Sequence, residues 1–429
     1  MVTVFGLGFV GLTTALGFAH MGYKVYGIDV DAERKNTLRA GRLPFMEPHM
    51  EEQLKKHLGQ NFFIADEVEK AVADSSYVFY CVGTPYGQEG RADLSYLLAA
   101  VDETAAAVSD DKFRVLVIKS TVPPSTTAEK IYPYVQSKGV ISQQFGVANN
   151  PEFLREGHCW EDFIGADRIV LGCGDKRSKE MLEELYRPMG IPVLCVSPST
   201  GEFIKYLSNT LLATLVSFSN EMSQIAEAVG EIDVADAFHI LHMDKRWGGC
   251  EMAGYVYPGC GYGGYCLPKD TCALLAQAEE KGYEPQILKN VIRVNECRPL
   301  AAAEKIMEGL EKDQVVGILG LSFKPGSDDV RDTPAGKIIG ILQEQGWRNI
   351  AAYDPVAVEE FKTHYKELKV AYKGSVEEVY EAADVVAVVT AWEEFRCVPA
   401  MGDKRIVDCR YMFSGMQVHK KRILGGKNG

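Results

Sequence analysis

The sequence predicts an α/β protein with two doubly wound domains joined by a long central helix and a helical region. Three observations support this class. Strand-like and helical segments alternate from the N-terminus, as they do in a parallel sheet covered by helices on both faces. Residues 201–229 form one helical pattern, because neither glycine nor proline occurs between Glu202 and Val229. The alternation restarts at Val315, and 429 residues allow roughly three units of about 150 residues.

Each α/β half begins with a strand, a glycine-containing turn and a helix. In the first half, strands are expected at 2–5, 24–28, 77–82, 115–119 and 145–148, with a helix from the turn to about Met21. In the second, strands are expected at 315–319, 350–353, 385–390 and 405–408, with a helix at 335–345. The helix at 201–229 is apolar on more than one face, so it should be buried in a domain core or against a partner.

Composition excludes several classes of protein. The net charge is 46 − 59 = −13, which disfavours general binding to nucleic acid or anionic membranes. Eleven cysteines, mostly within apolar stretches, indicate reduced thiols in a cytoplasmic protein, and their spacing predicts no metal site. The first twenty residues are nearly uncharged, but four glycines interrupt them and no basic residue precedes them. We therefore expect neither a signal peptide nor a membrane span.

A dinucleotide-binding fingerprint explains those glycines. Gly6, Gly8 and Gly11 follow a strand and open a helix, and Asp29 ends the next strand 29 − 6 = 23 residues after the first glycine. The glycines permit a tight turn, close approach of a pyrophosphate and close packing of helix on strand. Asp29 can accept hydrogen bonds from ribose hydroxyls and would repel a 2′-phosphate, which favours NAD. Arg34 leaves NADP open, since a nearby arginine can accommodate that phosphate.

A second motif, Pro258-Gly259-Cys260-Gly261-Tyr262-Gly263-Gly264-Tyr265-Cys266-Leu267-Pro268-Lys269-Asp270, precedes a helix expected at 271–281. A thiol just before a helix start with Lys269 nearby should have a lowered pKa, which is how a nucleophilic cysteine is made. The alternative is a buried thiol in a glycine-rich loop.

With these motifs the sequence resembles the UDP-glucose/GDP-mannose dehydrogenases over nearly the whole chain. The matching stretches, besides the two motifs above, are Val82-Gly83-Thr84-Pro85, Lys119-Ser120-Thr121-Val122-Pro123, Asn150-Pro151-Glu152-Phe153-Leu154-Arg155-Glu156-Gly157, Glu202-Phe203-Ile204-Lys205-Tyr206-Leu207-Ser208-Asn209, Gly320-Leu321-Ser322-Phe323-Lys324-Pro325 and Asp329-Val330-Arg331.

The resemblance implies an NAD-binding Rossmann-like domain at 1–198, a central helical dimerisation domain at 199–300 and a Rossmann-like domain at 301–429 that holds the substrate's nucleotide (UDP). It implies a homodimer that oxidises the C6 alcohol of a nucleotide sugar to a carboxylate with two NAD in succession. The Gly-Tyr-Gly-Gly form of the loop favours UDP-glucose, with UDP-glucuronate as product. GDP-mannose or an N-acetylated sugar nucleotide is the alternative. A catalytically silent nucleotide-binding regulator is a hypothesis of another class.

The catalytic residues implied by the resemblance suit this chemistry. Cys266 would trap the aldehyde as a thiohemiacetal and later form a thioester. Lys205 and Asn209, four residues apart on one helix face, would stabilise an alkoxide or oxyanion. Asp270, Glu152 and Thr121 would handle the hydrolytic water or a proton.

The resemblance also implies two sets of binding residues. For NAD, beyond Gly6, Gly8 and Gly11, they are Val10, Asp29, Arg34, Thr84, Thr121, Glu156, Lys269 and Arg331. For the nucleotide sugar they are Glu152, Phe153, Leu154, Arg155, Glu156, Lys205, Asn209, Tyr255, Val256, Tyr257, Pro258, Gly259, Gly263, Phe323, Lys324 and Arg410.

Two positions depart from the family pattern. The family usually has an arginine before the glycine-rich loop that reaches the partner subunit's sugar. Arg246 lies 266 − 246 = 20 residues before Cys266, and residues 247–254 contain an expected insertion. Tyr265 stands where serine is common, so its ring is expected to reshape the sugar pocket.

Overall fold

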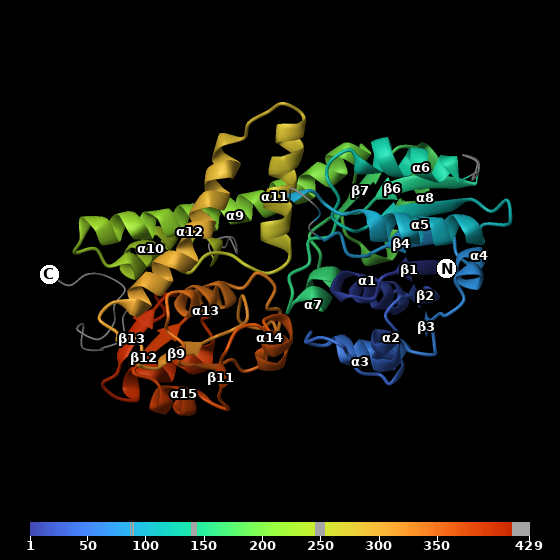
Figure 1. Cartoon of the computed structure of the whole chain (residues 1–429). Coiled ribbons are helices and arrows are strands. Elements are labelled where there is room, and N and C mark those ends of the chain that lie inside the picture. The colour runs from blue at the N-terminus through green and yellow to red at the C-terminus, as the bar shows by residue number, and fades with distance from the viewer. Residues whose placement is uncertain (86, 88–89, 139–143, 245–253, 414–429) are drawn as a thin grey trace. The chain divides into compact units, whose positions relative to one another are not determined.

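The computed structural model describes residues 1–85, 87, 90–138, 144–244 and 254–413 (Figure 1). The chain divides into two compact units, Met1–Ser208 and Asn209–Gly429. The boundary falls within the long helix α9 (Pro198–Val229). No helix among the described residues is long and apolar enough to span a membrane.

The first unit contains an eight-stranded sheet in the order β3-β2-β1-β4-β5-β6-β7-β8, parallel except where β7 runs antiparallel to β6. The strands are β1 (Val2–Phe5), β2 (Val25–Ile28), β3 (Phe62–Ile64), β4 (Tyr77–Tyr80), β5 (Arg114–Ile118), β6 (Phe145–Asn149), β7 (Ile169–Cys173) and β8 (Val193–Val196). The helices are α1 (Phe9–His20), α2 (Ala32–Arg39), α3 (Met50–His57), α4 (Val68–Asp74), α5 (Ser95–Ala107), α6 (Tyr132–Ser137), α7 (Cys159–Ile164) and α8 (Lys176–Tyr186), with short helical turns η2 (Thr127–Ile131) and η3 (Arg187–Met189).

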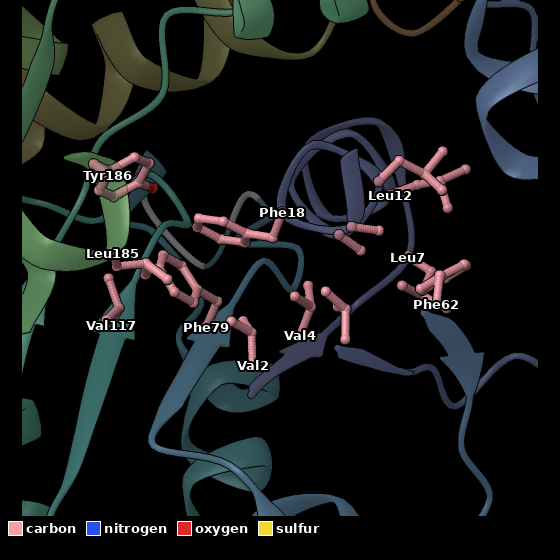
Figure 2. Packing of buried hydrophobic residues seen from close by; sticks show 14 of the residues in the cluster. Val2, Val4, Leu7, Leu12, Phe18, Phe62, Phe79, Val117, Leu185 and Tyr186 are labelled. Carbon is pink, nitrogen blue, oxygen red and sulfur yellow. The ribbon is translucent and has the colours of Figure 1, made fainter. Parts of the chain in front are cut away.

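Apolar cores cover both faces of this sheet because successive side chains of a strand point to opposite faces. Val115 and Val117 of β5 belong to one core cluster, whereas Leu116 and Ile118 belong to the other. Figure 2 shows the first cluster, in which Phe18 of α1 lies over the strands. Strands buried on both faces are the mark of a doubly wound α/β sheet.

The second unit combines helices with a smaller sheet. It holds α9 from Asn209 onward, α10 (Val234–His242), α11 (Cys266–Glu280) and α12 (Gln286–Met307). The five-stranded parallel sheet has the order β11-β10-β9-β12-β13. Its strands are β9 (Val316–Leu319), β10 (Ile350–Tyr353), β11 (Ala371–Tyr372), β12 (Val385–Val388) and β13 (Arg405–Asp408), and its helices are α13 (Pro334–Glu344), α14 (Val358–His364), α15 (Val376–Ala382) and η6 (Glu393–Ala400). This order repeats that of β3-β2-β1-β4-β5, so the predicted fold class is confirmed.

The strands β3, β7, β8 and β11 were not predicted from the sequence, and two further details differ from the expectations. The helix expected at 271–281 begins five residues earlier, at Cys266. Pro268 is tolerated there because the amide groups of a first turn have no partner within the helix. In the second unit, α9 is not buried all round, since Leu211, Phe218 and Ile225 are 46%, 49% and 50% exposed. The prediction that a domain core buries this face of α9 is therefore wrong. The alternative, that a partner covers it, remains a prediction.

A buried carboxyl group fastens the start of α9 to the first unit. Glu202 Oε1 accepts hydrogen bonds from the Thr127 N–H at 2.7 Å and from the Thr127 hydroxyl at 2.5 Å. Glu202 Oε2 is buried without a hydrogen-bond partner among the described residues. Burial raises the pKa of Glu202 to about 7 although the hydrogen bonds from Thr127 oppose it.

Glu202 should make stability depend on pH. Its folded-state pKa of about 7 exceeds the ordinary 4.5, so the folded state retains the proton longer and stability falls as pH rises between those values. Glu202→Gln cannot ionise and is expected to raise the free energy of unfolding by about 2 kcal/mol more at pH 8 than at pH 5. Urea unfolding at both pH values measures this. The exposed control Glu129→Gln should show no such difference, and equal gains for both variants would contradict the assignment.

Candidate active site

The turn after β1 has the geometry of a phosphate-binding loop. Gly6 has φ +84°, and a Cβ on Gly11 would lie 1.7 Å from the Gly6 carbonyl oxygen, so helix and turn touch backbone to backbone. Gly8 is the N-cap of α1, and a Cβ there would meet nothing within 4 Å. The N-terminus of α1 is therefore open to an anion, which the helix dipole attracts. Val10 lies on the first turn of this helix and is partly exposed.

Asp29 follows β2 and closes this turn. Its Oδ2 accepts the Leu7 N–H at 2.7 Å and its Oδ1 accepts the Asp31 N–H at 2.9 Å. Arg34 Nη1 lies 3.0 Å from Asp29 Oδ2, so the arginine is paired with the carboxylate rather than directed away from it. A carboxylate at this place suits ribose hydroxyls, and the loop and acid together fit NAD.

Predicted cofactor residues also follow β4 and β5. Thr84 is 3% exposed, and its hydroxyl donates a hydrogen bond to the Thr121 carbonyl at 2.8 Å. The Ser120 hydroxyl donates to the Val82 carbonyl at 2.6 Å. These bonds join the two loops that leave the carboxyl ends of adjacent parallel strands, which is where α/β sheets bind ligands.

A buried ion pair joins the segment after β6 to α9. Lys205 Nζ lies 2.8 Å from Glu152 Oε1, and each side chain is 6% exposed. Burial alone would raise the pKa of Glu152, but the Lys205 ammonium and the hydrogen bond from the Leu154 N–H hold it below its usual value. Lys205 Nζ also lies 5.6 Å from the centre of the Phe153 ring. Glu152 is thus an ionised carboxylate in a nearly dry setting.

Two neighbours of this pair are placed differently. Arg155 is exposed and forms a two-point ion pair with Asp162, with Nη2 2.7 Å from Oδ1. Glu156 is partly buried. The structure therefore brings Glu152, Phe153 and Leu154 together around Lys205, while the charged group of Arg155 is engaged with α7.

In the second unit, Cys266 is the first residue of α11. The same turn carries a buried chain of polar groups. Lys269 Nζ lies 2.5 Å from Asp270 Oδ1, and Asn209 Nδ2 donates to Asp270 Oδ2 at 2.5 Å. Asp270 is 0% and Lys269 2% exposed. Three predicted residues therefore lie in one hydrogen-bonded set beside the predicted nucleophile.

The glycine loop before Cys266 packs directly on the segment after β9. A Cβ on Gly263 would lie 2.5 Å from the Asp332 carbonyl oxygen, and one on Gly264 would lie 3.0 Å from the Phe323 ring. The Gly264 N–H donates to the Arg331 carbonyl at 2.9 Å. Predicted NAD and sugar residues from two motifs about 60 residues apart therefore border the same loop as Cys266. Lys324 lies beside them, with Nζ 5.5 Å from the Phe323 ring centre.

Tyr265, the departure from the family pattern, contacts two predicted cofactor residues. The Arg331 guanidinium lies 4.4 Å and Lys269 Nζ 5.5 Å from the centre of its ring. Asp329 holds the other side of Arg331 at 2.8 Å. The ring is therefore positioned to orient Arg331 by a cation–π contact.

The start of the glycine loop meets the segment after β13. Arg410 Nη1 would be 2.4 Å from a Cβ on Gly259, so its guanidinium lies against that glycine. The Tyr257 hydroxyl donates to the Tyr411 carbonyl at 3.1 Å. Val256 and Pro258 are buried and Tyr255 is partly buried. The predicted substrate residues 255–259 and Arg410 are therefore neighbours.

Sequence reasoning missed the groups that hold this loop. Asn220 Oδ1 accepts the Gly259 N–H at 2.7 Å, and Arg298 Nε donates to the Gly259 carbonyl at 3.1 Å. Asn220 lies 220 − 209 = 11 residues after Asn209, a spacing of about three helical turns that places both on one face. That periodicity could have identified Asn220, whereas nothing in the local sequence marks Arg298. Arg246 and residues 247–253 of the expected insertion lie outside the described residues.

The phosphate-binding loop after β1 and the acid after β2 define an NAD-dependent oxidoreductase. The five-stranded sheet of the second unit, with the same strand order, indicates a further nucleotide-binding domain. Three family models match the chain: the NAD-binding domain of the UDP-glucose/GDP-mannose dehydrogenase family at residues 1–190, its central domain at 199–297 and its UDP-binding domain at 317–415. The chain belongs to this family, and it is an enzyme that oxidises a nucleotide sugar with NAD as cofactor.

Individual relatives agree. UDP-glucose 6-dehydrogenase YwqF of Bacillus subtilis is 36% identical over 96% of this chain and 92% of its own length. The Pseudomonas aeruginosa UDP-glucose 6-dehydrogenase is also 36% identical, over 92% of this chain and 88% of its own. The structure of a UDP-glucose dehydrogenase from Pyrobaculum islandicum matches with TM-score 0.89 and 37% identity, covering 96% of this chain and 94% of that one. A UDP-D-ManNAc dehydrogenase from Pyrococcus horikoshii matches with TM-score 0.83 and 27% identity, covering 99% and 98%.

Tyr265 should affect use of the cofactor. Tyr265→Ser removes the ring that orients Arg331 and is expected to raise the KM for NAD about two- to tenfold, the range that a partly exposed cation–π contact gives. Tyr265→Phe keeps the ring and should stay within about twofold of the parent, as the same contact predicts. Initial rates at saturating nucleotide sugar measure both. An unchanged KM for NAD in Tyr265→Ser would show that the ring does not position Arg331.

Proposed function

We propose that this enzyme converts UDP-glucose to UDP-glucuronate through a covalent intermediate on Cys266. The observation that carries the proposal is the place of Cys266, first residue of α11 and directly after a glycine loop bordered by Phe323, Arg331 and Arg410. The relatives named UDP-glucose 6-dehydrogenase, at about 36% identity over most of the chain, support this substrate.

Two NAD molecules, bound in succession, would each accept one of the two hydrides that leave the sugar C6. In the first oxidation the C6 hydroxyl loses a proton as hydride leaves, and an aldehyde forms. Lys205, desolvated beside Glu152, stabilises the negative oxygen. Asn209 shares that helix face one turn further on. Thr121, whose carbonyl accepts the Thr84 hydroxyl, orders a water in this step.

The Cys266 thiolate then adds to the aldehyde carbon, and the carbonyl oxygen takes up a proton to give a thiohemiacetal. Loss of a second hydride and of that proton gives a thioester. Water adds to the thioester carbon, the C–S bond breaks, and the carboxylate and the free thiol are released. Glu152, kept ionised by Lys205, is a base for this water. Asp270, held by Asn209 and Lys269, orients it.

The covalent step has a direct test. The parent enzyme with UDP-glucose and excess NAD is expected to yield about two NADH and one UDP-glucuronate per sugar, since both oxidations precede release. Cys266→Ser should lower turnover by at least about a thousandfold because a hydroxyl at this place is a poor nucleophile. Absorbance at the NADH band and product chromatography measure both. If Cys266→Ser retained full turnover with two NADH per sugar, a covalent intermediate on Cys266 would be refuted.

A different sugar nucleotide is the second candidate. The structural match to a UDP-D-ManNAc dehydrogenase, with TM-score 0.83, supports an N-acetylated sugar nucleotide as the alternative substrate. The same assay over UDP-glucose, UDP-N-acetylmannosamine and GDP-mannose decides it by the ratio of kcat/KM values. A preference for GDP-mannose or UDP-N-acetylmannosamine would reject UDP-glucose while leaving the covalent chemistry in place.

The exposed stripe of α9 supports a homodimer, which is part of the proposal. Leu211, Phe218 and Ile225 recur every seven residues, so they lie on one face, and all are about half exposed. A long apolar stripe on one helix is the type of surface that a second copy covers.

Charges in this stripe should separate the subunits. Phe218→Glu combined with Ile225→Glu is expected to give monomers, because burying two carboxylates in an apolar interface is unfavourable. Ile287→Glu is the matched control, since Ile287 on α12 is 74% exposed. Light scattering after gel filtration measures the mass of each. A monomeric parent, or a double variant that stays dimeric, would reject this interface.

A further inference from the structure

Two cysteines far apart in the sequence meet beside the proposed nucleotide subsite. Cys260 lies in the glycine loop, and Cys409 directly follows β13. Cys260 Sγ lies 3.7 Å from the Cys409 carbonyl oxygen, and each thiol is near enough to shift the pKa of the other. Cys260 is 1% exposed, whereas Cys409 is partly exposed. Both are free thiols.

The surroundings favour a thiolate on Cys260. The neighbouring Cys409 side chain lowers the pKa of Cys260, burial opposes it, and the positive charges of Arg410 and Arg298 lower it further. The Cys260 side chain, together with burial, raises the pKa of Cys409. The pair thus consists of one thiol inclined to ionise and one inclined to keep its proton, which is the arrangement of an attacking and a resolving cysteine.

Each cysteine adjoins a residue placed at the nucleotide. Cys260 follows Gly259 and Cys409 precedes Arg410, whose guanidinium lies against Gly259. The Gly259 backbone is fixed on both sides, its N–H by Asn220 and its carbonyl by Arg298. A change in the separation of the two sulfurs therefore changes the position of Arg410 relative to Gly259.

We propose that Cys260 and Cys409 are a site of reversible oxidation, at which a peroxide converts them to a disulfide that weakens nucleotide binding. The disulfide depends on the geometry of the cysteine pair. Its effect on nucleotide binding rests on the proposed function, in which Gly259 and Arg410 contact the nucleotide sugar. The glycine loop carries Cys266 six residues further on, but the pair does not include that residue.

The chemistry balances with hydrogen peroxide as oxidant. The Cys260 thiolate attacks one peroxide oxygen, the O–O bond breaks, and a sulfenic acid and hydroxide result. The Cys409 sulfur then attacks the Cys260 sulfur, the S–O bond breaks, and the oxygen leaves as water with the Cys409 proton. Two thiols and one peroxide thus give one disulfide and two waters. A dithiol such as dithiothreitol reverses the change.

The new bond is shorter than the contact that it replaces. A disulfide needs its sulfurs about 2.0 Å apart and its Cβ atoms about 3.8 Å apart, whereas the Cys260 sulfur now lies 3.7 Å from the Cys409 carbonyl oxygen. Closing the bond therefore shifts the backbones that carry Gly259 and Arg410 relative to each other. Arg410 then no longer offers its planar, charged donors to a diphosphate at the same place.

Peptide mapping tests the disulfide on the full chain. The tryptic peptide 406–410 contains Cys409 alone, and peptide 247–269 contains Cys250, Cys260 and Cys266. After peroxide treatment and alkylation, mass spectrometry is expected to detect these peptides linked. The link should disappear in Cys260→Ser and Cys409→Ser and persist in Cys250→Ser and Cys266→Ser. An unlinked parent, or a link that survives in Cys260→Ser, would overturn the proposal.

Uridine diphosphate binding tests the consequence in Cys266→Ser, where peroxide cannot act on the proposed nucleophile. Peroxide is expected to weaken binding about tenfold by calorimetry, and dithiothreitol should restore it. Cys260→Ser combined with Cys266→Ser should bind equally before and after peroxide. Unchanged affinity in linked protein would reject the effect on the nucleotide. Absence of binding in the reduced chain would instead reject the proposed nucleotide subsite, while the linked peptides still decide the disulfide.

Discussion

The arrangement of the second unit depends on a glycine-rich loop. Between Gly259 and Gly264 the backbone passes so close to its neighbours that a single methyl group would overlap Arg410, the Asp332 carbonyl or Phe323. Because the loop is pressed against these groups, its end is fixed, and α11 must begin at Cys266. The place of the proposed nucleophile therefore follows from close packing of the backbone.

The buried ion pairs serve position more than stability. Lys205 with Glu152 and Lys269 with Asp270 are nearly withdrawn from water, and desolvation of such pairs often cancels their mutual attraction. A hydrophobic pair of similar size would hold the fold as well. What these pairs provide is a fixed charge in a setting of low dielectric, where a lysine or carboxylate acts strongly on a developing charge.

The sequence was sufficient for the fold class and for residues that carry their own local signal. Alternating strands and helices predicted five strands of the first sheet and four of the second, and the glycines with Asp29 predicted the turn after β1. The sequence did not reveal partners that depend on three-dimensional packing. Arg298 supports Gly259 from a helix that is 39 residues away in the chain, and Tyr265 meets Arg331 across 66 residues. Half-exposure of Leu211 and Phe218 also could not be predicted, because an apolar helix has the same pattern whether a core or a partner covers it.

The two sheets share one hydrogen-bonding arrangement, which has a different role in each unit. In each, an acid after the second strand accepts the N–H of the residue that follows a left-handed glycine: Asp29 from Leu7 at 2.7 Å, and Asp354 from Leu321 at 2.8 Å. The Asp29 carboxylate also pairs with the side chain of Arg34, which is partly exposed.

The Asp354 carboxylate accepts additional hydrogen bonds from neighbouring side chains. Its Oδ2 also accepts the Ser322 hydroxyl at 2.9 Å and the Trp392 indole N–H at 3.1 Å, and it is 2% exposed. These neutral donors saturate the carboxylate, so a ribose could approach only by breaking them. The Arg34 side chain, 35% exposed, can give way to a ribose more easily than a buried hydroxyl and indole can. The same strand order therefore provides a dinucleotide site in the first unit, while in the second the equivalent acid is a structural support and the proposed substrate contacts are Phe323, Lys324 and Arg410.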